Sequence, residues 1–409
     1  MEDRKETAFS GPGEKDAEFE FTVSDKTGKA RIEVRASGGG ESARFTMEIE
    51  VRSPNPPETR SELRILNPGE KSEQAFIPFG IKGTSSATVE VSSMPSINLT
   101  EKLDWLIAYP HGCSEQITSA LFPQLFISRL APGNEELSAK SASNISIGIN
   151  TLLGRQMNNG GIPLWPGAYQ PDNWITSYVS HFILEAEKTG YSIPSSFRQR
   201  LLRYQKTTAQ SWRHDINYPY TANDQAYRLF ILALAGQPER GAMNRLRETT
   251  ELPALARWLL AAAFAESGRP EAAEELVDLR SYDIEPEYYH YYYGSPLRDR
   301  TVILYTLAVL KKYEEALPLL KEICSEINRS DGWYSTQTIG WGLYAYMKFA
   351  GLSATGEKRI ARIAMNFNGE KKEISAAPGM IGSENLRIRD DNNKLILENI
   401  SSDPLYVTF

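Results

Sequence analysis

A cysteine and a glutamine stand three residues apart in the stretch AYPHGCSEQITSALFPQLF, residues 108–126. Residues i and i+3 of a helix or tight turn face the same side, so the thiol of Cys113 can reach the carboxamide of Gln116. Loss of ammonia from this pair would form an internal thioester, which acylates an arriving amine or hydroxyl and frees the thiol. Pro110 and Gly112 are expected to set the turn into the helix and to let the backbone pack closely.

The spacing by itself leaves other interpretations open. A Cys-x-x-Gln is more often a buried cysteine beside the start of a helix. Cys113 could also be a hydrolase nucleophile activated by the helix N-terminus, with His111 or His214 as its base. Neither histidine has a recognisable carboxylate or asparagine to orient it, which speaks against a hydrolase. Cys324, within the amphipathic EEALPLLKEICSEI, is expected to be a small buried hydrophobe.

The composition is that of a globular chain and excludes several classes of partner. The 409 residues suffice for two or three domains, with 24% charged and 41% hydrophobic residues and a net charge of −7. No basic stripe or nucleic-acid motif is present, so we expect no nucleic-acid partner. No apolar run approaches the ~18 residues of a membrane span. With only two cysteines and four histidines, neither a structural zinc site nor another metal or cofactor is expected.

Alternating apolar and polar residues predict β-strands on both sides of a helical region. Before it stand AEFEFTV, KARIEVRA and ARFTMEIEVR and, after the break SPNPPETR, SELRIL, SEQAFIPF and SATVEVSS. After it come KRIARIAMNFNG, EKKEISAA, NLRIRD, NKLILENI and PLYVTF. Short alternating runs between turn signals are typical of antiparallel sandwiches.

Residues from about 100 to 352 change to a helical period. NLTEKLDWLIAY opens this region with Asn98 or Thr100 as a plausible N-cap, and about a dozen helices are expected in all. Their ranges are 115–130, 137–155, 173–188, 195–208, 222–236, 239–249, 252–266, 269–279, 298–311, 313–328 and 335–350. The short turns between them indicate paired helices stacked around an axis. A helical domain inserted into a β-sandwich explains this order better than three independent domains.

The longer string YPHGCSEQITS resembles the thioester segment P-x-G-C-x-E-Q of the α2-macroglobulin and complement family, and its leading tyrosine resembles the bacterial members. NGGIPLWPGAYQPDNWITSYVSHFILEAEKTGY is similar to the Gly-Trp-Pro and Trp-x-Thr-x-Tyr segment of their thioester domain. YYYGSPLRDRTVIL and DGWYSTQTIGWGLYAY resemble two later signatures of that domain. Together these segments cover most of residues 100–350 in the family's order.

The resemblance implies a multidomain α and β chain. An α/α toroid thioester domain would be inserted in a CUB-like β-sandwich, preceded by part of a macroglobulin-type β-sandwich. The implied ranges are a flexible lead-in at 1–15, a partial macroglobulin-like domain at 16–55, the first half of the CUB-like domain at 56–99, the thioester domain at 100–353 and the second CUB-like half at 354–409.

The resemblance also implies roles for single residues. Cys113 would supply the sulfur and Gln116 the acyl group of the thioester. Gly112 and Glu115 occupy motif positions, and Tyr109 matches a tyrosine that shields the thioester. Glu115 has an equally weighted second interpretation, a solvated acid in the first turn that the helix dipole stabilises.

Two histidines are candidates for passing the acyl group on to hydroxyls. His214 follows the motif at about the expected distance, and His290 lies on a loop that could come near. Direct attack by lysine amines is the stronger expectation, since a lone histidine is more often a surface or hydrogen-bonded residue. His111 replaces an aromatic residue common at that position of the bacterial motif.

The implied function is that of a broad-spectrum protease inhibitor, which is not an enzyme because its thioester is used once and stoichiometrically. Its partners would be target proteases, bound through a lysine, and the remaining domains of the full-length inhibitor, in the periplasm or at the outer membrane. We recognise neither a bait region nor the macroglobulin domain that follows the CUB-like domain in the family. In this stretch of sequence we therefore expect a thioester that is hydrolysed or never formed.

Two other function classes stay open. One is an α/α-toroid carbohydrate-active enzyme, a lyase or glycosidase, which needs an acid/base pair in a central cleft; outside the tyrosine run 288–293 no such pair is evident. The other is a binding module with an inactive thioester site.

Overall fold

The computed structural model describes residues 3–20, 27–52, 58–95, 97, 102, 106, 112–127, 135–277, 282, 294–329, 334–353, 360–377 and 380–409. The chain divides into two compact units. One contains residues 1–58, 75–87 and 387–394, and the other contains residues 59–74, 88–386 and 395–409. The mixture of helix and sheet expected from the sequence is confirmed.

The first unit contains a long hairpin of two antiparallel strands, β1 (Gly28–Gly38) and β2 (Glu41–Val51). Gly39 and Gly40 form its loop with φ of +62° and +87°, backbone angles that suit the tight turn of a two-residue hairpin. Pairs such as Val34 opposite Phe45 place apolar residues along one face. Both side chains are exposed. The predicted strand AEFEFTV is not a strand at residues 17–20, and its remainder lies outside the described residues.

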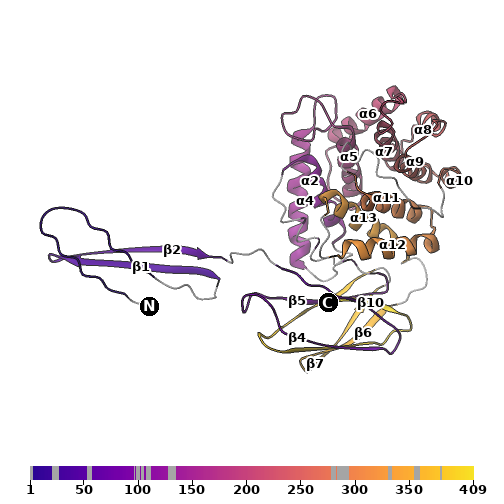
Figure 1. Ribbon diagram of the computed structural model, residues 1–409. Coiled ribbons are helices and arrows are strands. Elements are labelled where there is room, and N and C mark those ends of the chain that lie inside the picture. Colours follow the sequence, from indigo (N-terminus) through magenta and orange to yellow (C-terminus); the bar gives the residue numbers. More distant parts are fainter. Residues whose placement is uncertain are drawn as a thin grey trace. The chain divides into compact units, whose positions relative to one another are not determined.

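Strands from before and after the helices share two four-stranded sheets. The first has the order β3 (Leu63–Leu66), β10 (Leu405–Thr408), β5 (Ala87–Ser92), β8 (Gly382–Leu386). The second has the order β4 (Lys71–Phe76), β9 (Asn393–Asn399), β6 (Ala361–Phe367), β7 (Glu370–Ala376). In Figure 1 the purple strand β5 accordingly lies beside the yellow strand β10. The helical region is thus inserted between strands of the same sheets, as the sequence predicts.

One predicted strand is placed differently. The pattern NLRIRD predicts a strand over residues 385–390, but β8 covers Gly382–Leu386. At Gly382 the backbone runs so close to β7 that an added Cβ would lie 2.7 Å from the carbonyl oxygen of Ser375. Only glycine permits this approach at the first residue of β8, and the strand begins three residues before the alternating pattern at 385–390.

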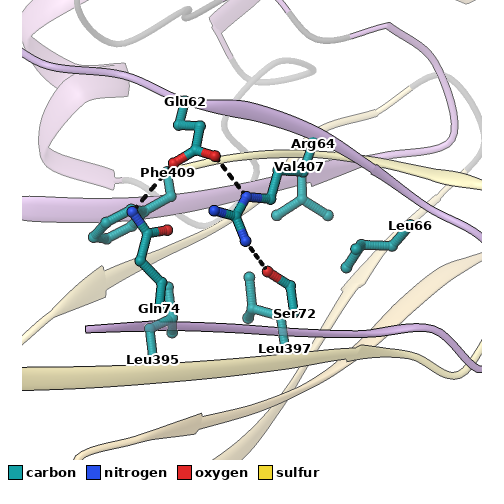
Figure 2. A pocket seen from close by; sticks show the side chains of 9 residues that line it. All are labelled: Glu62, Arg64, Leu66, Ser72, Gln74, Leu395, Leu397, Val407 and Phe409. Carbon is teal, nitrogen blue, oxygen red and sulfur yellow. Dashed lines mark hydrogen bonds and ion pairs between the residues drawn. The ribbon is translucent and has the colours of Figure 1, made fainter. Parts of the chain in front are cut away.

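The two sheets enclose a small cavity, drawn in Figure 2. Leu66 and Val407 line it from one sheet, and Leu395 and Leu397 from the other. Arg64 closes its polar side by donating to Glu62 at 2.7 Å and to Ser72 at 2.5 Å (Figure 2). With about 10 Å³ the cavity has room for a single water at most, so it is no ligand site.

The helices between these strands form an inner and an outer layer (Figure 1). In the inner layer each helix contacts the next, and α13 closes the cycle by contacting α2. Its described members are α2 (Ser114–Leu121), α5 (Asn173–Lys188), α7 (Thr221–Leu234), α9 (Ala254–Glu266), α11 (Pro296–Val309) and α13 (Thr336–Ser353). The described helices outside them are α4 (Glu135–Arg155), α6 (Ser195–Ser211), α8 (Arg240–Arg247), α10 (Pro270–Glu274) and α12 (Tyr313–Ile327).

The side-chain patterns explain the two layers. Helices α7 and α9 are buried on nearly every side, as expected for helices surrounded by others. Helices α4 and α6 bury one face and expose the other. This layered ring agrees with the predicted pairing around an axis.

The predicted helix 115–130 ends early. Helix α2 stops at Leu121, and a 3₁₀ turn, η1 (Pro123–Phe126), follows. Pro123 has no N–H to donate and its ring would clash with a carbonyl one turn earlier, so it disfavours continuation of α2 beyond this point. The expected opening helix with Asn98 or Thr100 as N-cap lies largely outside the described residues. Among the described residues, no helix has the length and apolar character that a membrane span requires.

Candidate functional site

The thiol and the carboxamide singled out by the sequence meet at the start of α2. Cys113 is the N-cap residue, in an extended conformation, and Gln116 is the third helical residue. The backbone N–H of Gln116 donates to Cys113 Sγ at 3.4 Å, and the backbone N–H of Cys113 donates to Gln116 Oε1 at 3.3 Å. This reciprocal arrangement is a capping box in which Cys113 stands in the usual position of Ser or Thr. It holds both reactive side chains on one turn.

The Cys113 turn is fixed by groups from two other segments. The backbone N–H of Ser114 donates to the carbonyl of Leu164 at 2.8 Å, and its hydroxyl donates to the carbonyl of Pro163 at 2.7 Å. Arg155, the last residue of α4, donates to the same hydroxyl at 3.1 Å and to the carbonyl of Gly112. The loop that carries the family-like GIPLW sequence thus packs directly against the thiol-bearing turn.

Cys113 is only 4% exposed, and this burial affects the chemistry of its thiol. Burial raises the pKa of the Cys113 thiol above its ordinary value, and the nearby carboxyl of Glu115 acts in the same direction. The N–H of Gln116 and the charge of Arg155 oppose this rise in the pKa. A free thiol at this position is therefore kept largely protonated at neutral pH, which slows its reactions without preventing them.

Glu115 points into the protein and not into solvent. Its side chain is 7% exposed and accepts hydrogen bonds from Ser119 Oγ at 2.6 Å and from Thr336 Oγ1 at 2.9 Å and 3.0 Å. The alternative of a solvated first-turn acid is therefore wrong, because the hydroxyl of Thr336, at the start of α13, covers the carboxyl. Burial raises the pKa of Glu115, and the two hydroxyl donors reduce the rise.

The two later segments of the resemblance meet the Trp-x-Thr-x-Tyr helix beside this site. The indole of Trp174, at the start of α5, donates to Gln337 Oε1 at 3.2 Å. Arg298, at the start of α11, donates to the same oxygen at 2.6 Å and lies over the Trp174 ring at 4.6 Å. Gln337 directly follows Thr336, which contacts Glu115. These contacts connect the N-terminal ends of α2, α5, α11 and α13.

A histidine that the sequence analysis did not single out lies at the centre of the inner layer. His181 is fully buried, and its Nδ1 and Nε2 lie 3.1 Å and 2.9 Å from the hydroxyls of Tyr227 and Tyr344. The rings of Phe122 and Trp341 pack around it, with centroids at 5.0 Å and 5.3 Å. Burial lowers its pKa to about 3, so the ring is neutral at physiological pH. It is a structural residue.

The remaining predicted residues have mixed outcomes. Tyr109, His111 and His290, together with Pro110 and the tyrosine run 288–293, lie outside the described residues. His214 is exposed in the connection between α6 and α7, with its ring 6.1 Å from that of Trp212, so its acyl-transfer role stays a prediction. Cys324 is buried, as expected, with its Sγ 3.6 Å from the carbonyl of Pro95; both cysteines are free.

For Gly112, the described residues do not show the expected close packing. Among them, an added Cβ at this position would meet only Arg155 Nη2, at 3.9 Å, which is ordinary van der Waals contact. The expected turn at Gly112 stays a prediction. The sequence analysis also missed Arg155, Ser119 and Thr336, whose contacts with the motif come from distant segments or from the helix interior.

The buried carboxyl of Glu115 gives a testable pH dependence. A carboxyl whose pKa is raised by folding binds its proton more tightly in the folded protein, so stability is lost as pH rises through the window above its unfolded value. We expect Glu115→Gln to lose less unfolding free energy than the wild type between pH 5 and pH 8 in urea titrations. Glu136→Gln, which removes an exposed first-turn acid of α4, is the control. Equal pH dependence of Glu115→Gln and the wild type would contradict the burial argument.

The contact between α13 and α2 depends on a glycine. A Cβ at Gly340 would lie 2.9 Å from the Tyr178 hydroxyl and 3.1 Å from the carbonyl of Ser119. We expect Gly340→Ala to lower the unfolding free energy by about 1–3 kcal/mol through overpacking. On the same helix Gly351 faces open space, so Gly351→Ala should be neutral or stabilising by up to about 1 kcal/mol. Chemical denaturation of the pair measures both, and equal effects would exclude a tight contact at Gly340.

Comparisons with known proteins agree with the resemblance. No family model matches the chain. Alpha-2-macroglobulin of Escherichia coli is 28% identical over 352 residues, which is 80% of this chain and 21% of that protein. Alpha-2-macroglobulin of Xylella fastidiosa is 24% identical over 375 residues, which is 86% of this chain and 22% of that protein. The chain thus spans about a fifth of the length of these curated relatives.

Solved structures show the same fold. The native Escherichia coli alpha-2-macroglobulin from domain MG7 to the C-terminus has a TM-score of 0.69 at 23% identity, covering 94% of this chain and 62% of that one. Salmonella alpha-2-macroglobulin reacted with methylamine has a TM-score of 0.69 at 24% identity, covering 94% and 26%. The trypsin-activated Escherichia coli protein has a TM-score of 0.53 at 23% identity, covering 93% and 27%. The expected resemblance to the C-terminal region of bacterial alpha-2-macroglobulins is confirmed.

Proposed function

From its likeness to the bacterial alpha-2-macroglobulins, we propose that this chain is the part of a protease inhibitor that attaches covalently to its target. The bond that does so is a thioester between Cys113 Sγ and the side-chain carbonyl of Gln116. The observation that carries the proposal is the reciprocal capping box, which holds the thiol and the carboxamide on one turn of α2.

The chemistry requires two acyl transfers. In the first, the thiolate of Cys113 attacks the carboxamide carbon of Gln116, the C–N bond breaks, and nitrogen leaves as ammonia after taking up a proton. In the second, a lysine amine attacks the same carbon, the C–S bond breaks, and the proton lost by the amine restores the thiol. The backbone N–H of Cys113 already donates to Gln116 Oε1, so it is placed to stabilise negative charge on that oxygen in both steps.

After this reaction the acyl group of Gln116 stays bonded to the lysine of the target, so each chain acts once. The proposed reaction uses no cofactor or metal. The proposed partners are target proteases, attacked through surface lysines, and the other domains of the inhibitor. A relative activated by trypsin supports the choice of proteases as partners. The proposed location, the periplasm or outer membrane, rests on the same likeness. Burial of Cys113 supports protection of the bond from water until a conformational change exposes it.

The carbohydrate-active enzyme receives no support from the acids beside this site. Its general acid and base would have to face a substrate, but Glu115 and Asp299 are 7% and 0% exposed. Asp299 is further engaged by the Arg298 guanidinium at 2.5 Å. A binding module with an inactive thioester site remains the contrasting outcome of the experiment below.

Intact mass spectrometry of the native protein, with and without methylamine, tests the proposal, followed by peptide mapping of residues 108–126. A mass short by one ammonia, with methylamine label on Gln116 and a newly alkylatable Cys113, is expected for a live thioester. A glutamate at position 116 is expected where the thioester formed and was hydrolysed, the state we expect if this chain is isolated alone. An unmodified glutamine with no label under all conditions would overturn the proposal in favour of a binding module.

A further inference from the structure

Arg155 holds both residues that flank Cys113. From the end of α4 it donates to the carbonyl of Gly112 on one side and, at 3.1 Å, to the hydroxyl of Ser114 on the other. The same hydroxyl donates onward to Pro163. One guanidinium therefore spans the turn whose middle residue carries the thiol. The planar, multiply donating guanidinium suits such a bridge, whereas a lysine offers only a point charge.

The guanidinium of Arg155 lies beside the turn that carries the thiol, and its charge lowers the pKa of the Cys113 thiol as the smallest of the resolved influences. Within the described part of the chain, no carboxylate forms an ion pair with this guanidinium. Among the described residues, the charged groups that influence Cys113 are Arg155, which lowers the pKa of the thiol, and Glu115, which raises it. Burial has the largest effect and raises the pKa. Arg155 is thus the described positive charge that favours the thiolate at this position.

We propose that Arg155 is a positioning residue of the acyl-transfer site, which fixes the Cys113 turn and stabilises the Cys113 thiolate. The second role matters when the thiolate is the leaving group. As an amine nitrogen bonds to the acyl carbon of Gln116, the C–S bond breaks and its electron pair stays on sulfur. The adjacent guanidinium stabilises that pair without giving up a proton, until the proton released by the amine reaches the sulfur. This role in amine transfer rests on the proposed function; the effect on the thiol does not.

The thiol can be titrated without any thioester in a Gln116→Ala background, which keeps the backbone N–H that faces Cys113. We would measure the rate of Cys113 alkylation by iodoacetamide against pH, mapping the label to this peptide. The midpoint of the profile is the readout, because intrinsic nucleophilicity changes with the pKa and distorts rates at a single pH. Arg155→Gln removes the charge but keeps a donor for Gly112, and Arg155→Lys keeps the charge.

Arg155→Gln should raise the midpoint so that the thiolate fraction at neutral pH falls about three- to tenfold, as expected for loss of a nearby opposite charge. Arg155→Lys should stay close to the parent. Arg200→Met is the matched control, since Arg200 contacts the neighbouring Gln156 at 2.7 Å and not the thiol turn. An unchanged midpoint in Arg155→Gln, or equal shifts in Arg155→Gln and Arg155→Lys, would overturn the role of the charge.

A second experiment separates this inference from the proposed function. In chains that retain Gln116, the fraction short by one ammonia is measured first, and the rate of its loss on adding methylamine is measured next. Arg155→Gln should open about three- to tenfold more slowly than Arg200→Met. If every chain, wild type included, keeps an unmodified glutamine at position 116 and shows neither the ammonia-short mass nor a glutamate there, the proposed function fails. The thiol titration then still decides whether Arg155 stabilises the thiolate.

Discussion

Cys113→Ala is expected to abolish every trace of acyl chemistry at Gln116. Without the thiol there is no nucleophile for the carboxamide, so the variant should show neither the ammonia-short mass, nor methylamine label, nor a glutamate at position 116. The loss should be complete, because Gln116 has no other thiol on its turn and an unactivated carboxamide is stable to amines. Peptide mapping of residues 108–126 measures all three products in one experiment.

The other cysteine supplies the matched control. Cys324 is also buried and free, but it lies in α12 with its sulfur beside the carbonyl of Pro95. Cys324→Ala should therefore leave the state of Gln116 unchanged. Gln116→Ala should abolish uptake as completely as Cys113→Ala while leaving an alkylatable thiol at position 113. Methylamine attached to Gln116 in Cys113→Ala would rule out the thioester mechanism.

His181→Ala is expected to cause a large loss of stability, about 3–5 kcal/mol of unfolding free energy, as for other ring-to-alanine changes in cores. The ring fills the space between Phe122, Tyr344 and Trp341, and its two nitrogens are hydrogen-bonded to Tyr227 and Tyr344. Its removal leaves a cavity and two buried hydroxyls without these partners. Chemical denaturation at neutral pH measures the loss.

The exposed His214 provides the control for the His181→Ala prediction. His214→Ala removes the same atoms from a surface connection, so its effect should stay within about 0.5 kcal/mol. Burial lowers the pKa of His181 to about 3. Below pH 6.5 the unfolded chain binds a proton at this histidine that the folded protein does not bind, so the unfolding free energy falls as the pH drops from 6.5 towards 3. His181→Ala should lack that part of the acid sensitivity. A loss below about 1 kcal/mol at neutral pH would show that the ring is not tightly packed.

Much of the fold follows from periodicity, since α5 matches its predicted range of 173–188 and α9 and α12 begin or end within two residues of theirs. Strands β6 and β9 alternate buried and less buried residues as expected. The errors occur where a single residue interrupts a pattern, as Pro123 ends α2, or where backbone approach decides, as at Gly382. The order of the elements predicted that strands before and after the helical region share one β domain. Which strands pair with which became known only from the structure.

The site was predictable only as far as it is local. Cys113 and Gln116 share one turn, and the i to i+3 rule is sufficient to bring them together. Arg155 belongs to no recognisable motif. From the sequence alone it is a basic residue in the last turn of α4, where a positive charge interacts favourably with the helix dipole. Likewise, nothing in the spacing of Glu115 distinguishes a solvated acid from one covered by Thr336. Long-range packing decides such questions, and a single sequence does not encode it in any local pattern.

The hydrogen bond from Thr336 to Glu115 joins residues separated by 221 positions, and it links α13 with the helix that begins at Cys113. During synthesis at roughly 5–20 residues per second, the thiol and carboxamide are therefore made roughly 10–45 seconds before Thr336. Throughout that interval the nascent turn lacks the covering contact that completes its surroundings. A premature stop before α13 should therefore yield a chain in which Cys113 and Gln116 are present but the carboxyl of Glu115 lacks its hydrogen bond from Thr336.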